Sequence, residues 1–166
     1  MSIKKVIFVC TGNTCRSPMA QFLFDKFLKF KGVEGVEVLS MGVWADGVTG
    51  IMQNARQVLF DRDIKEVVHT SAPFMPSKEK TTIFIGMTRD HKKSMIEIIE
   101  SNNYAIGTKG KQKKPYIKNI ISIYDIIGCD IDDPYGSDLT YYKKTADLLA
   151  ESCPKLLKYI NTVKIS

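Results

Sequence analysis

The sequence predicts an α/β fold built on a parallel sheet, because short apolar runs alternate along the chain with segments of helical periodicity. Four runs have the length and the β-branched or aromatic character of buried strands, at residues 4–10, 36–39, 81–87 and 117–124. With 166 residues, 44% hydrophobic and 25% charged, the chain has ordinary globular composition and can bury a full core. We expect one domain over residues 1–166.

The first strand and the helix after it are the best-defined pair. Residues 6–9 form a continuous apolar run, which Gly12 and Asn13 then break. Ser17 is a good N-cap and Pro18 fits a first helical turn, so we expect a helix that begins there and continues to about residue 32. Four residues at helical spacing are expected on its inner face: Phe22, Leu23, Phe27 and Phe30.

The rest of the chain continues this alternation. Helices are predicted at residues 51–60, 90–99 and 139–160, and Pro154 could disturb the last of them. The inner face of the helix at residues 51–60 comprises Ala55, Val58 and Leu59. In sheets of this kind functional sites lie beyond the carboxyl ends of the strands, so the loops that follow the strands are expected to carry the chemistry.

Charge and hydropathy argue against two kinds of partner. Both halves of the chain share the net charge of +6, and the densest lysine cluster, at residues 109–118, has the glycine and proline content of a solvated loop. No aromatic ladder accompanies these lysines, which argues against nucleic-acid binding. No apolar run reaches the length of a membrane helix or a signal-peptide core, so we expect a cytoplasmic protein with no membrane partner. We also expect a monomer.

The cysteine and carboxylate patterns do not predict a metal or any other cofactor. The four cysteines include no Cys-x-x-Cys pair, and two histidines are too few to complete a zinc site readily. Asp130 and Asp132 fit the first ligand positions of a calcium loop, but Pro134 falls on the third and no glutamate closes it. The question that remains is whether one of the thiols is a nucleophile.

The loop after the first strand carries the strongest functional signal. It reads Cys10-Thr11-Gly12-Asn13-Thr14-Cys15-Arg16-Ser17. Between a buried strand and a helix N-terminus, such a loop can turn its backbone N–H groups toward one anion, and the helix dipole adds positive potential there. Arg16 can hold two phosphate oxygens, and Cys10 at the base of this anion site would be a thiolate nucleophile. Gly12 and Asn13 tolerate the left-handed backbone that the loop needs.

The spacing of Cys10 and Arg16 is a weak signal by itself, since Cys10 could simply be a small buried residue that ends a strand. The strand before the loop, the Gly-Asn pair inside it and the Ser-Pro helix start after it favour the catalytic interpretation. The loop is not a Walker loop, because the Gly-x4-Gly-Lys pattern is absent.

Residues 9–20, VCTGNTCRSPMA, resemble the signature of the low-molecular-weight protein tyrosine phosphatases. Further segments resemble this family in order along nearly the whole chain: Ser40-Met41-Gly42, His69-Thr70-Ser71, residues 84–88, and Asp132-Asp133-Pro134-Tyr135-Gly136. The resemblance implies a four-stranded parallel sheet flanked by helices, and a phosphorylated protein as substrate.

The resemblance also implies a role for each residue of the site. Cys10 would attack phosphorus and form a phosphocysteine, and Asp133 would be the general acid and then the base, with Asp132 as a solvated neighbour. Arg16 and the loop from Thr11 to Cys15 would hold the phosphoryl oxygens. Ser17 would both cap the helix and donate to the Cys10 sulfur. The support network of the loop would comprise Asn13, Ser40 and His69, whereas His91 is expected to be a solvated helix residue.

Two positions bear on the substrate. Typical tyrosine phosphatases of the family carry a bulky aliphatic residue where this chain has Thr14, and the branch with threonine there resembles bacterial protein arginine phosphatases. The acid loop has one aromatic residue, Tyr135, followed at once by Gly136, where many tyrosine phosphatases of the family have two. Tyr135 is expected to form one wall of the pocket and Trp44 the other, with core packing as the alternative for Trp44. These features favour phosphoarginine, with phosphotyrosine as the alternative.

Two other classes of function share the loop. A thiol-dependent arsenate reductase would need closely paired further cysteines, which Cys129 and Cys153 do not provide. A catalytically silent phosphopeptide-binding module would not require Cys10, Arg16 and Asp133 together. We therefore expect a cysteine-dependent protein phosphatase.

Overall fold

The computed structural model describes residues 2–101 and 117–163. Its sheet has four parallel strands in the order β2-β1-β3-β4, which confirms the predicted fold class. The strands are β1 (Lys5–Cys10), β2 (Glu37–Gly42), β3 (Thr82–Gly86) and β4 (Ile120–Ser122). The helices are α1 (Arg16–Phe30), α2 (Gln53–Phe60), α3 (Arg89–Ser101), α4 (Tyr124–Ile127) and α5 (Leu139–Thr162), and a 3-10 turn, η1, spans Ile117–Asn119.

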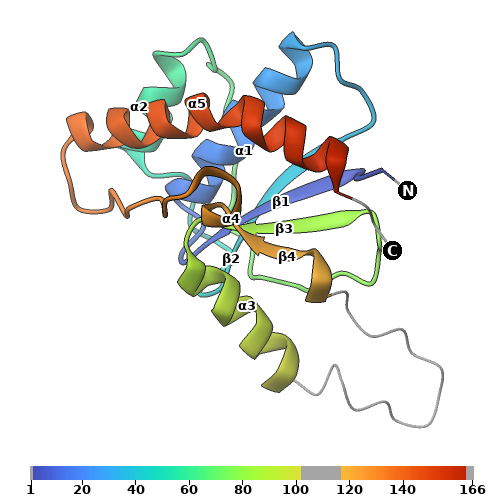
Figure 1. Ribbon diagram of the computed structural model, residues 1–166. Coiled ribbons are helices and arrows are strands. Elements are labelled where there is room, and N and C mark those ends of the chain that lie inside the picture. Colours follow the sequence, from blue (N-terminus) through green and yellow to red (C-terminus); the bar gives the residue numbers. More distant parts are fainter. Residues whose placement is uncertain (1, 102–116, 164–166) are drawn as a thin grey trace, which may run out of the picture.

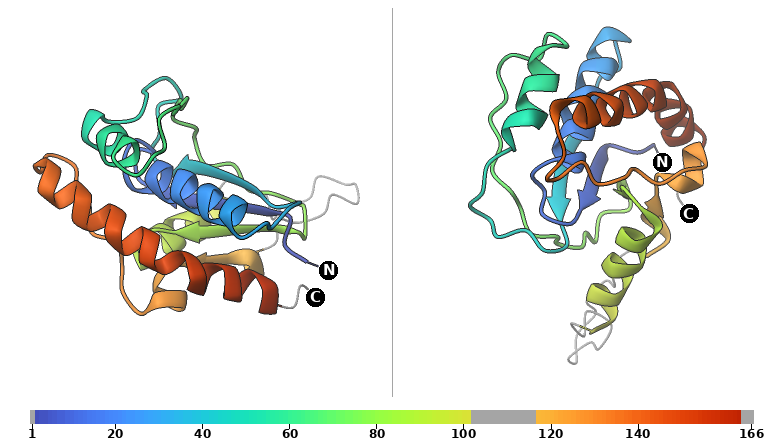
Figure 2. Two further views of the ribbon diagram at one scale, coloured as in Figure 1. Left: turned by 90° about the horizontal axis from the view of Figure 1, so that it is seen from above. Right: turned by 90° about the vertical axis from the view of Figure 1, so that its left-hand side faces the viewer.

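The helices cover the two faces of the sheet unequally. Helices α1, α2 and α5 pack together above one face, and α3 lies against the other (Figures 1 and 2). Strand β1 is buried on both sides, because Val6 and Phe8 join the core beneath α1 and α5 whereas Ile7 and Val9 join the core beneath α3. The continuous apolar run of β1 therefore reflects a strand that contacts helices on both faces.

Some predicted boundaries differ from the structure. The fourth strand is shorter than predicted, since residues 117–119 form η1 and only three residues of this edge strand pair with β3. The second strand is longer and reaches Gly42. Phe30 is 82% exposed at the last position of α1, so the inner face of that helix ends before it. Pro154 does not interrupt α5, which continues to Thr162.

The strand order places the carboxyl end of β1 at a point where the connections diverge. The chain leaves β1 toward α1 on one face, and it leaves the neighbouring β3 toward α3 on the other face (Figure 2). The ends of the two strands stay joined, because the backbone N–H of Met87 donates to the carbonyl of Val9 at 2.8 Å. Such a switch point is the usual position of a binding site in an open parallel sheet.

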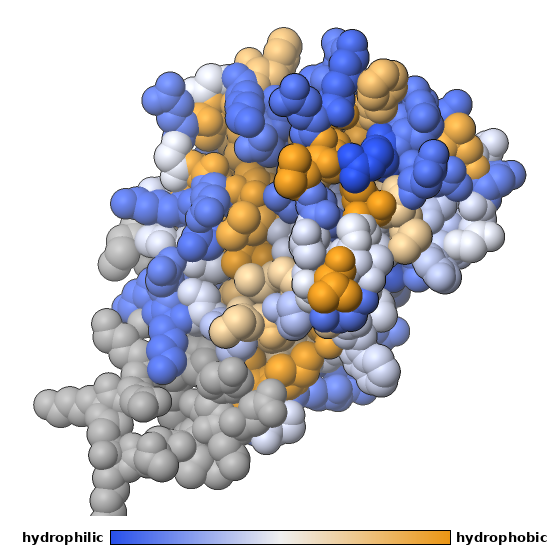
Figure 3. Space-filling model, turned by 180° about the vertical axis from the view of Figure 1, so that it is seen from behind, coloured by the Kyte–Doolittle hydropathy of each residue, from blue (hydrophilic) through white to orange (hydrophobic). Residues whose placement is uncertain are grey.

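The surface mixes hydrophilic with hydrophobic residues, as the face in Figure 3 shows. No helix in the described part of the chain combines the length and apolarity needed to cross a bilayer. Residues 109–116 of the predicted lysine cluster lie outside the described residues, and Lys118 at its end is exposed.

Gly42, at the end of β2, lies directly against the loop that follows β1. A Cβ atom at Gly42 would collide with the carbonyl oxygen of Thr11 and would approach the Asn13 nitrogen to 2.9 Å. We expect Gly42→Ala to lower the free energy of unfolding by roughly 1–3 kcal/mol, because backbone atoms cannot move aside as a side chain can. Gly50→Ala is the matched control, since its Cβ would meet only the His69 carbonyl at 3.6 Å. Equal thermal unfolding temperatures for the two variants would contradict this prediction.

Candidate active site

The loop between β1 and α1 reverses direction around Asn13. This residue has the left-handed φ of 58° that was expected in the loop, whereas Gly12 does not share it. The Asn13 side chain fixes the turn from both ends: Nδ2 donates to Ser17 Oγ at 2.8 Å, and Oδ1 accepts from the Ala72 N–H at 2.9 Å. His69 Nε2 donates to the Asn13 carbonyl at 2.7 Å. Asn13 and His69 therefore lie where a support network for the loop requires them.

Cys10 ends β1 with its sulfur next to the Ser17 hydroxyl, at 3.0 Å. Because Ser17 Oγ already accepts from Asn13, its own proton is available for the sulfur or for the Met41 carbonyl at 3.2 Å. A thiolate at Cys10 would therefore find a hydrogen-bond donor in place. Ser17 does not cap α1, which begins at Arg16 with Cys15 at the cap position and no side-chain cap. Its hydroxyl is used by the loop instead.

Arg16 joins the loop to the segment that contains Asp133. The Arg16 side chain is buried, with 7% of the residue exposed, and its Nη1 donates to the Ile131 carbonyl at 3.2 Å. Its Nη2 lies 3.3 Å from Asp133 Oδ2, and the other carboxylate oxygen accepts from the Tyr135 N–H at 3.2 Å. Asp133 remains half exposed at 52%, so its carboxylate is held in place but open to a ligand.

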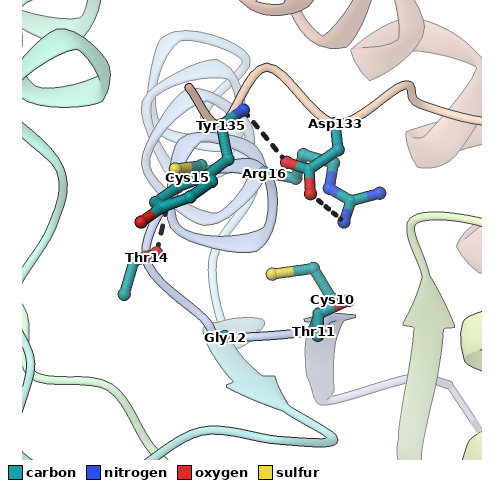
Figure 4. Close-up of a pocket in the computed structure, with 8 residues that line it drawn as sticks. All are labelled: Cys10, Thr11, Gly12, Thr14, Cys15, Arg16, Asp133 and Tyr135. Atoms are coloured by element: carbon teal, nitrogen blue, oxygen red, sulfur yellow. Dashed lines mark hydrogen bonds and ion pairs between the residues drawn. The ribbon is translucent and has the colours of Figure 1, made fainter. Parts of the chain in front are cut away.

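These groups line one cavity of about 200 Å³. The loop contributes Cys10, Thr11, Gly12, Thr14, Cys15 and Arg16, and the facing segment contributes Asp133 and Tyr135. Figure 4 shows the two segments on opposite sides, with the Asp133 carboxylate reaching toward the Arg16 guanidinium and the Cys10 sulfur below them. The arrangement places a thiol, a buried cation and a carboxylate around one space, which suits a nucleophilic attack on a bound phosphoryl group.

Two expectations need correction. Trp44 does not line this cavity and does not pack in the core, because it is 84% exposed in the turn after β2. Ser40 does not reach the loop, since its hydroxyl donates to Gln21 Oε1 at 2.6 Å; the contact of β2 with the loop comes from the Met41 carbonyl. Asp132, by contrast, is exposed as expected, and it lines a different cavity, beside α5.

His91 was expected to be solvated, but it is buried, with 6% of the residue exposed. Its ring lies between the hydroxyls of Thr11, at 2.9 Å, and Thr88, at 3.0 Å. Burial, and after it the charge of Arg16, lowers the pKa of His91 to about 4. The available signal was the Thr-x-x-His spacing at the start of a helix, which is typical of a threonine that caps the helix.

Tyr142 was not identified from the sequence. Its hydroxyl lies 3.3 Å from the Cys15 sulfur, and burial raises the pKa of the Cys15 thiol. The contact joins α5 to the loop across 127 positions of the chain, so no local sequence pattern predicts it. Cys129 is exposed and Cys153 is buried in α5, and neither lines the cavity. Among the described residues, no group of three or more His, Cys, Asp or Glu side chains could hold a metal ion.

The sequence is similar to known phosphatases over most of its length. The protein-arginine-phosphatase of Bacillus subtilis is 34% identical over 156 residues, which cover 93% of this chain and 95% of that protein. The protein of the same name from Geobacillus stearothermophilus is 32% identical, and the match covers 95% of this chain and 97% of that protein. The low molecular weight protein-tyrosine-phosphatase PtpB of Staphylococcus epidermidis is 27% identical, and the match covers 85% of this chain and 88% of that protein.

The fold is similar to that of solved phosphatases as well. A crystal structure of a YwlE mutant from Bacillus subtilis has a TM-score of 0.77 and 31% identity, and covers 95% of this chain and 99% of that one. A second structure is YwlE arginine phosphatase, solved as a cysteine-to-serine mutant with a phosphorylated active-site serine. It has a TM-score of 0.78 and 29% identity, and the match covers 96% of this chain and 97% of that one. The family model described as low molecular weight phosphotyrosine protein phosphatase matches residues 5–165. This chain therefore belongs to the low molecular weight phosphotyrosine protein phosphatase family, whose members are cysteine-dependent phosphatases.

Proposed function

We propose that this member of the family is a protein arginine phosphatase, which hydrolyses the P–N bond of phosphoarginine in a protein substrate. The observation that carries the proposal is the position of Thr14, which places a hydroxyl group on the wall of the cavity near Cys15. A guanidinium group needs hydrogen-bond acceptors around it, which a threonine provides and an aliphatic side chain does not. The names of the Bacillus and Geobacillus relatives support the same substrate.

In the first step the Cys10 thiolate attacks phosphorus in line with the bond that breaks. The new S–P bond forms as the P–N bond breaks, and the leaving guanidine nitrogen takes a proton from the Asp133 carboxyl. Arg16 and the backbone N–H groups of the loop would hold the phosphoryl oxygens as their charge shifts. A bound phosphoryl group would compete with Asp133 for Arg16, which frees the carboxyl group to face the leaving nitrogen.

In the second step water replaces the sulfur. Asp133, now a carboxylate, takes a proton from the water. The water oxygen attacks phosphorus at the same time, and the S–P bond breaks. Inorganic phosphate leaves, and the Cys10 thiolate forms again beside the Ser17 hydroxyl. Both steps use the same groups, and neither needs a cofactor.

Phosphotyrosine is the second candidate substrate. Tyr135 lines the cavity, and its ring could lie against the ring of a bound phosphotyrosine. The names of the staphylococcal relatives agree with this alternative. The deciding experiment compares kcat/KM on matched peptides that carry either phosphoarginine or phosphotyrosine, and a preference for phosphotyrosine would overturn the proposal.

The nucleophile can be separated from the anion site. Cys10→Ser should abolish turnover of para-nitrophenyl phosphate and leave inorganic phosphate binding measurable, because the anion is held by Arg16 and by backbone groups. Turnover is followed by absorbance and binding by calorimetry. Activity within tenfold of the parent protein would exclude Cys10 as the nucleophile, and a parent protein without turnover would favour a binding module.

The acid can be tested against its own neighbour. Asp133→Ala should lower kcat by roughly 10² or more, as expected for the loss of a general acid. The loss should be smallest for substrates whose leaving group needs little protonation. Asp132→Ala is the matched control and should change kcat little, since Asp132 is exposed and lies outside the cavity. If Asp132→Ala were the more damaging change, the assignment would be wrong by one residue.

Thr14 can be tested as the selector of the substrate. Thr14→Ile removes the hydroxyl and adds apolar surface that an aromatic ring can contact. We expect the ratio of kcat/KM for phosphotyrosine to that for phosphoarginine to rise roughly tenfold or more, which corresponds to about 1.4 kcal/mol. An unchanged ratio, or a shift toward phosphoarginine, would show that Thr14 does not select the substrate.

A further inference from the structure

The buried His91 ring connects the first turn of α3 to the wall of the active site. The position of α3 makes this contact possible, because the first turn of the helix packs closely against the backbone of Gly86 at the end of β3. A Cβ atom at Gly86 would lie 2.9 Å from the Lys92 nitrogen and 3.0 Å from His91 Cβ. Thr11, which His91 contacts, also lines the cavity that holds Cys10 and Arg16.

The protons of this chain of side chains can be assigned from its contacts. The backbone N–H of His91 donates to Thr88 Oγ1 at 3.2 Å, so this hydroxyl is already an acceptor. Its own proton is then free, and donating it to His91 Nδ1 at 3.0 Å uses the hydroxyl both as an acceptor and as a donor, so we assign Nδ1 as the acceptor. A neutral imidazole that accepts at Nδ1 carries its proton at Nε2, and Nε2 therefore donates to Thr11 Oγ1 at 2.9 Å.

The environment of His91 keeps this assignment stable. Burial and the nearby Arg16 lower the pKa of His91 to about 4, and the carboxylates of Asp133, Asp90 and Asp130 only partly oppose this shift. Because the pKa is lowered, the ring stays neutral at every pH well above that value. Nδ1 can then remain an acceptor, whereas a doubly protonated ring would turn two donors toward the threonines.

We propose that His91 is a positioning residue: by donating to Thr11 Oγ1 it leaves the Thr11 hydroxyl proton free to donate to an oxygen of the phosphoryl group in the cavity. The inference rests on the proposed phosphatase function and adds a side-chain donor to the backbone donors of the loop. A donor aimed at an anion contributes more than one between neutral groups. Thr11 becomes an oriented donor instead of a freely rotating hydroxyl.

The test uses the full-length protein and inorganic phosphate as the probe, measured as competitive inhibition of para-nitrophenyl phosphate turnover. Thr11→Val should weaken phosphate inhibition roughly tenfold, and Thr11→Ser should not. His91→Leu should weaken it to a similar extent, and Thr11→Val combined with His91→Leu should be no worse than either single change. Additive losses in the double variant would overturn the proposal, because they would show that the two residues act separately.

Two conservative variants distinguish positioning from simple packing. His91→Gln can place an amide N–H near the position of Nε2 and should restore most of the phosphate affinity. His91→Asn can satisfy Thr88 but cannot reach Thr11, so it should behave like Thr11→Val. Equal inhibition constants for the Gln and Asn variants would overturn the proposal, and this comparison remains decisive if His91→Leu does not fold.

A control and a baseline complete the experiment. Lys93→Ala changes an exposed residue of the same helix and should leave the inhibition constant unchanged. Failure of the parent protein to turn over any phosphorylated substrate would count against the proposed function. Turnover by the parent with no response to changes at His91 would count against this inference alone.

Discussion

The left-handed backbone of Asn13 is the constraint on which the rest of the site depends. The loop must reverse within a few residues for Cys10 at the end of β1 and Arg16 at the start of α1 to face one space. A left-handed residue costs about 1–2 kcal/mol, less for asparagine than for most residues. Hydrogen bonds to Ser17, Ala72 and His69 offset this cost. One residue thereby connects the nucleophile, the helix and the segment that precedes β3.

Arg16 extends this order to the other side of the cavity. Its guanidinium binds the Ile131 carbonyl, while the Ile131 N–H donates to the Met87 carbonyl at 2.9 Å. The segment that carries Asp133 is therefore anchored to the end of β3 as well as to Arg16. Arg89, at the start of α3, adds an ion pair with Asp130 at 3.0 Å. Asp133 lies in a segment without regular structure. Contacts with the segments that follow β1 and β3 nevertheless fix its position relative to the phosphoryl site.

The strand order explains why so many elements meet at one point. Because β1 and β3 are neighbours whose connections leave toward opposite faces, the first turns of α1 and α3 both begin beside the cavity. His91 comes from the first turn of α3, which begins directly after Thr88, and Arg16 and Ser17 come from the first turn of α1. A buried charged or polar side chain at this position is surrounded by the ends of strands and helices. Their backbone N–H and C=O groups supply hydrogen bonds that replace those lost from water.

How much could be read from the sequence depended on how far apart the interacting residues lie. By itself the sequence determined the α/β class, the buried character of the first strand and the candidate nucleophile and cation. The strand, the loop and the helix start are contiguous there, so spacing and residue type carry the information. Asp133 followed from the resemblance of its short segment. These features are local, and local chain geometry constrains them.

Only the tertiary structure decided the rest. The burial of His91 depends on a contact with Thr11 across 80 positions, and the contact of Tyr142 with Cys15 spans 127. Trp44 is exposed and Ser40 binds Gln21, although each residue stands in a segment that suggested a place at the site. Ser17 matched a helix cap by residue type, yet its hydroxyl is used by Asn13 and Cys10. Hydrogen bonds between distant segments form only when the sheet brings the strand ends together, and no pattern along the chain records which side chains then meet.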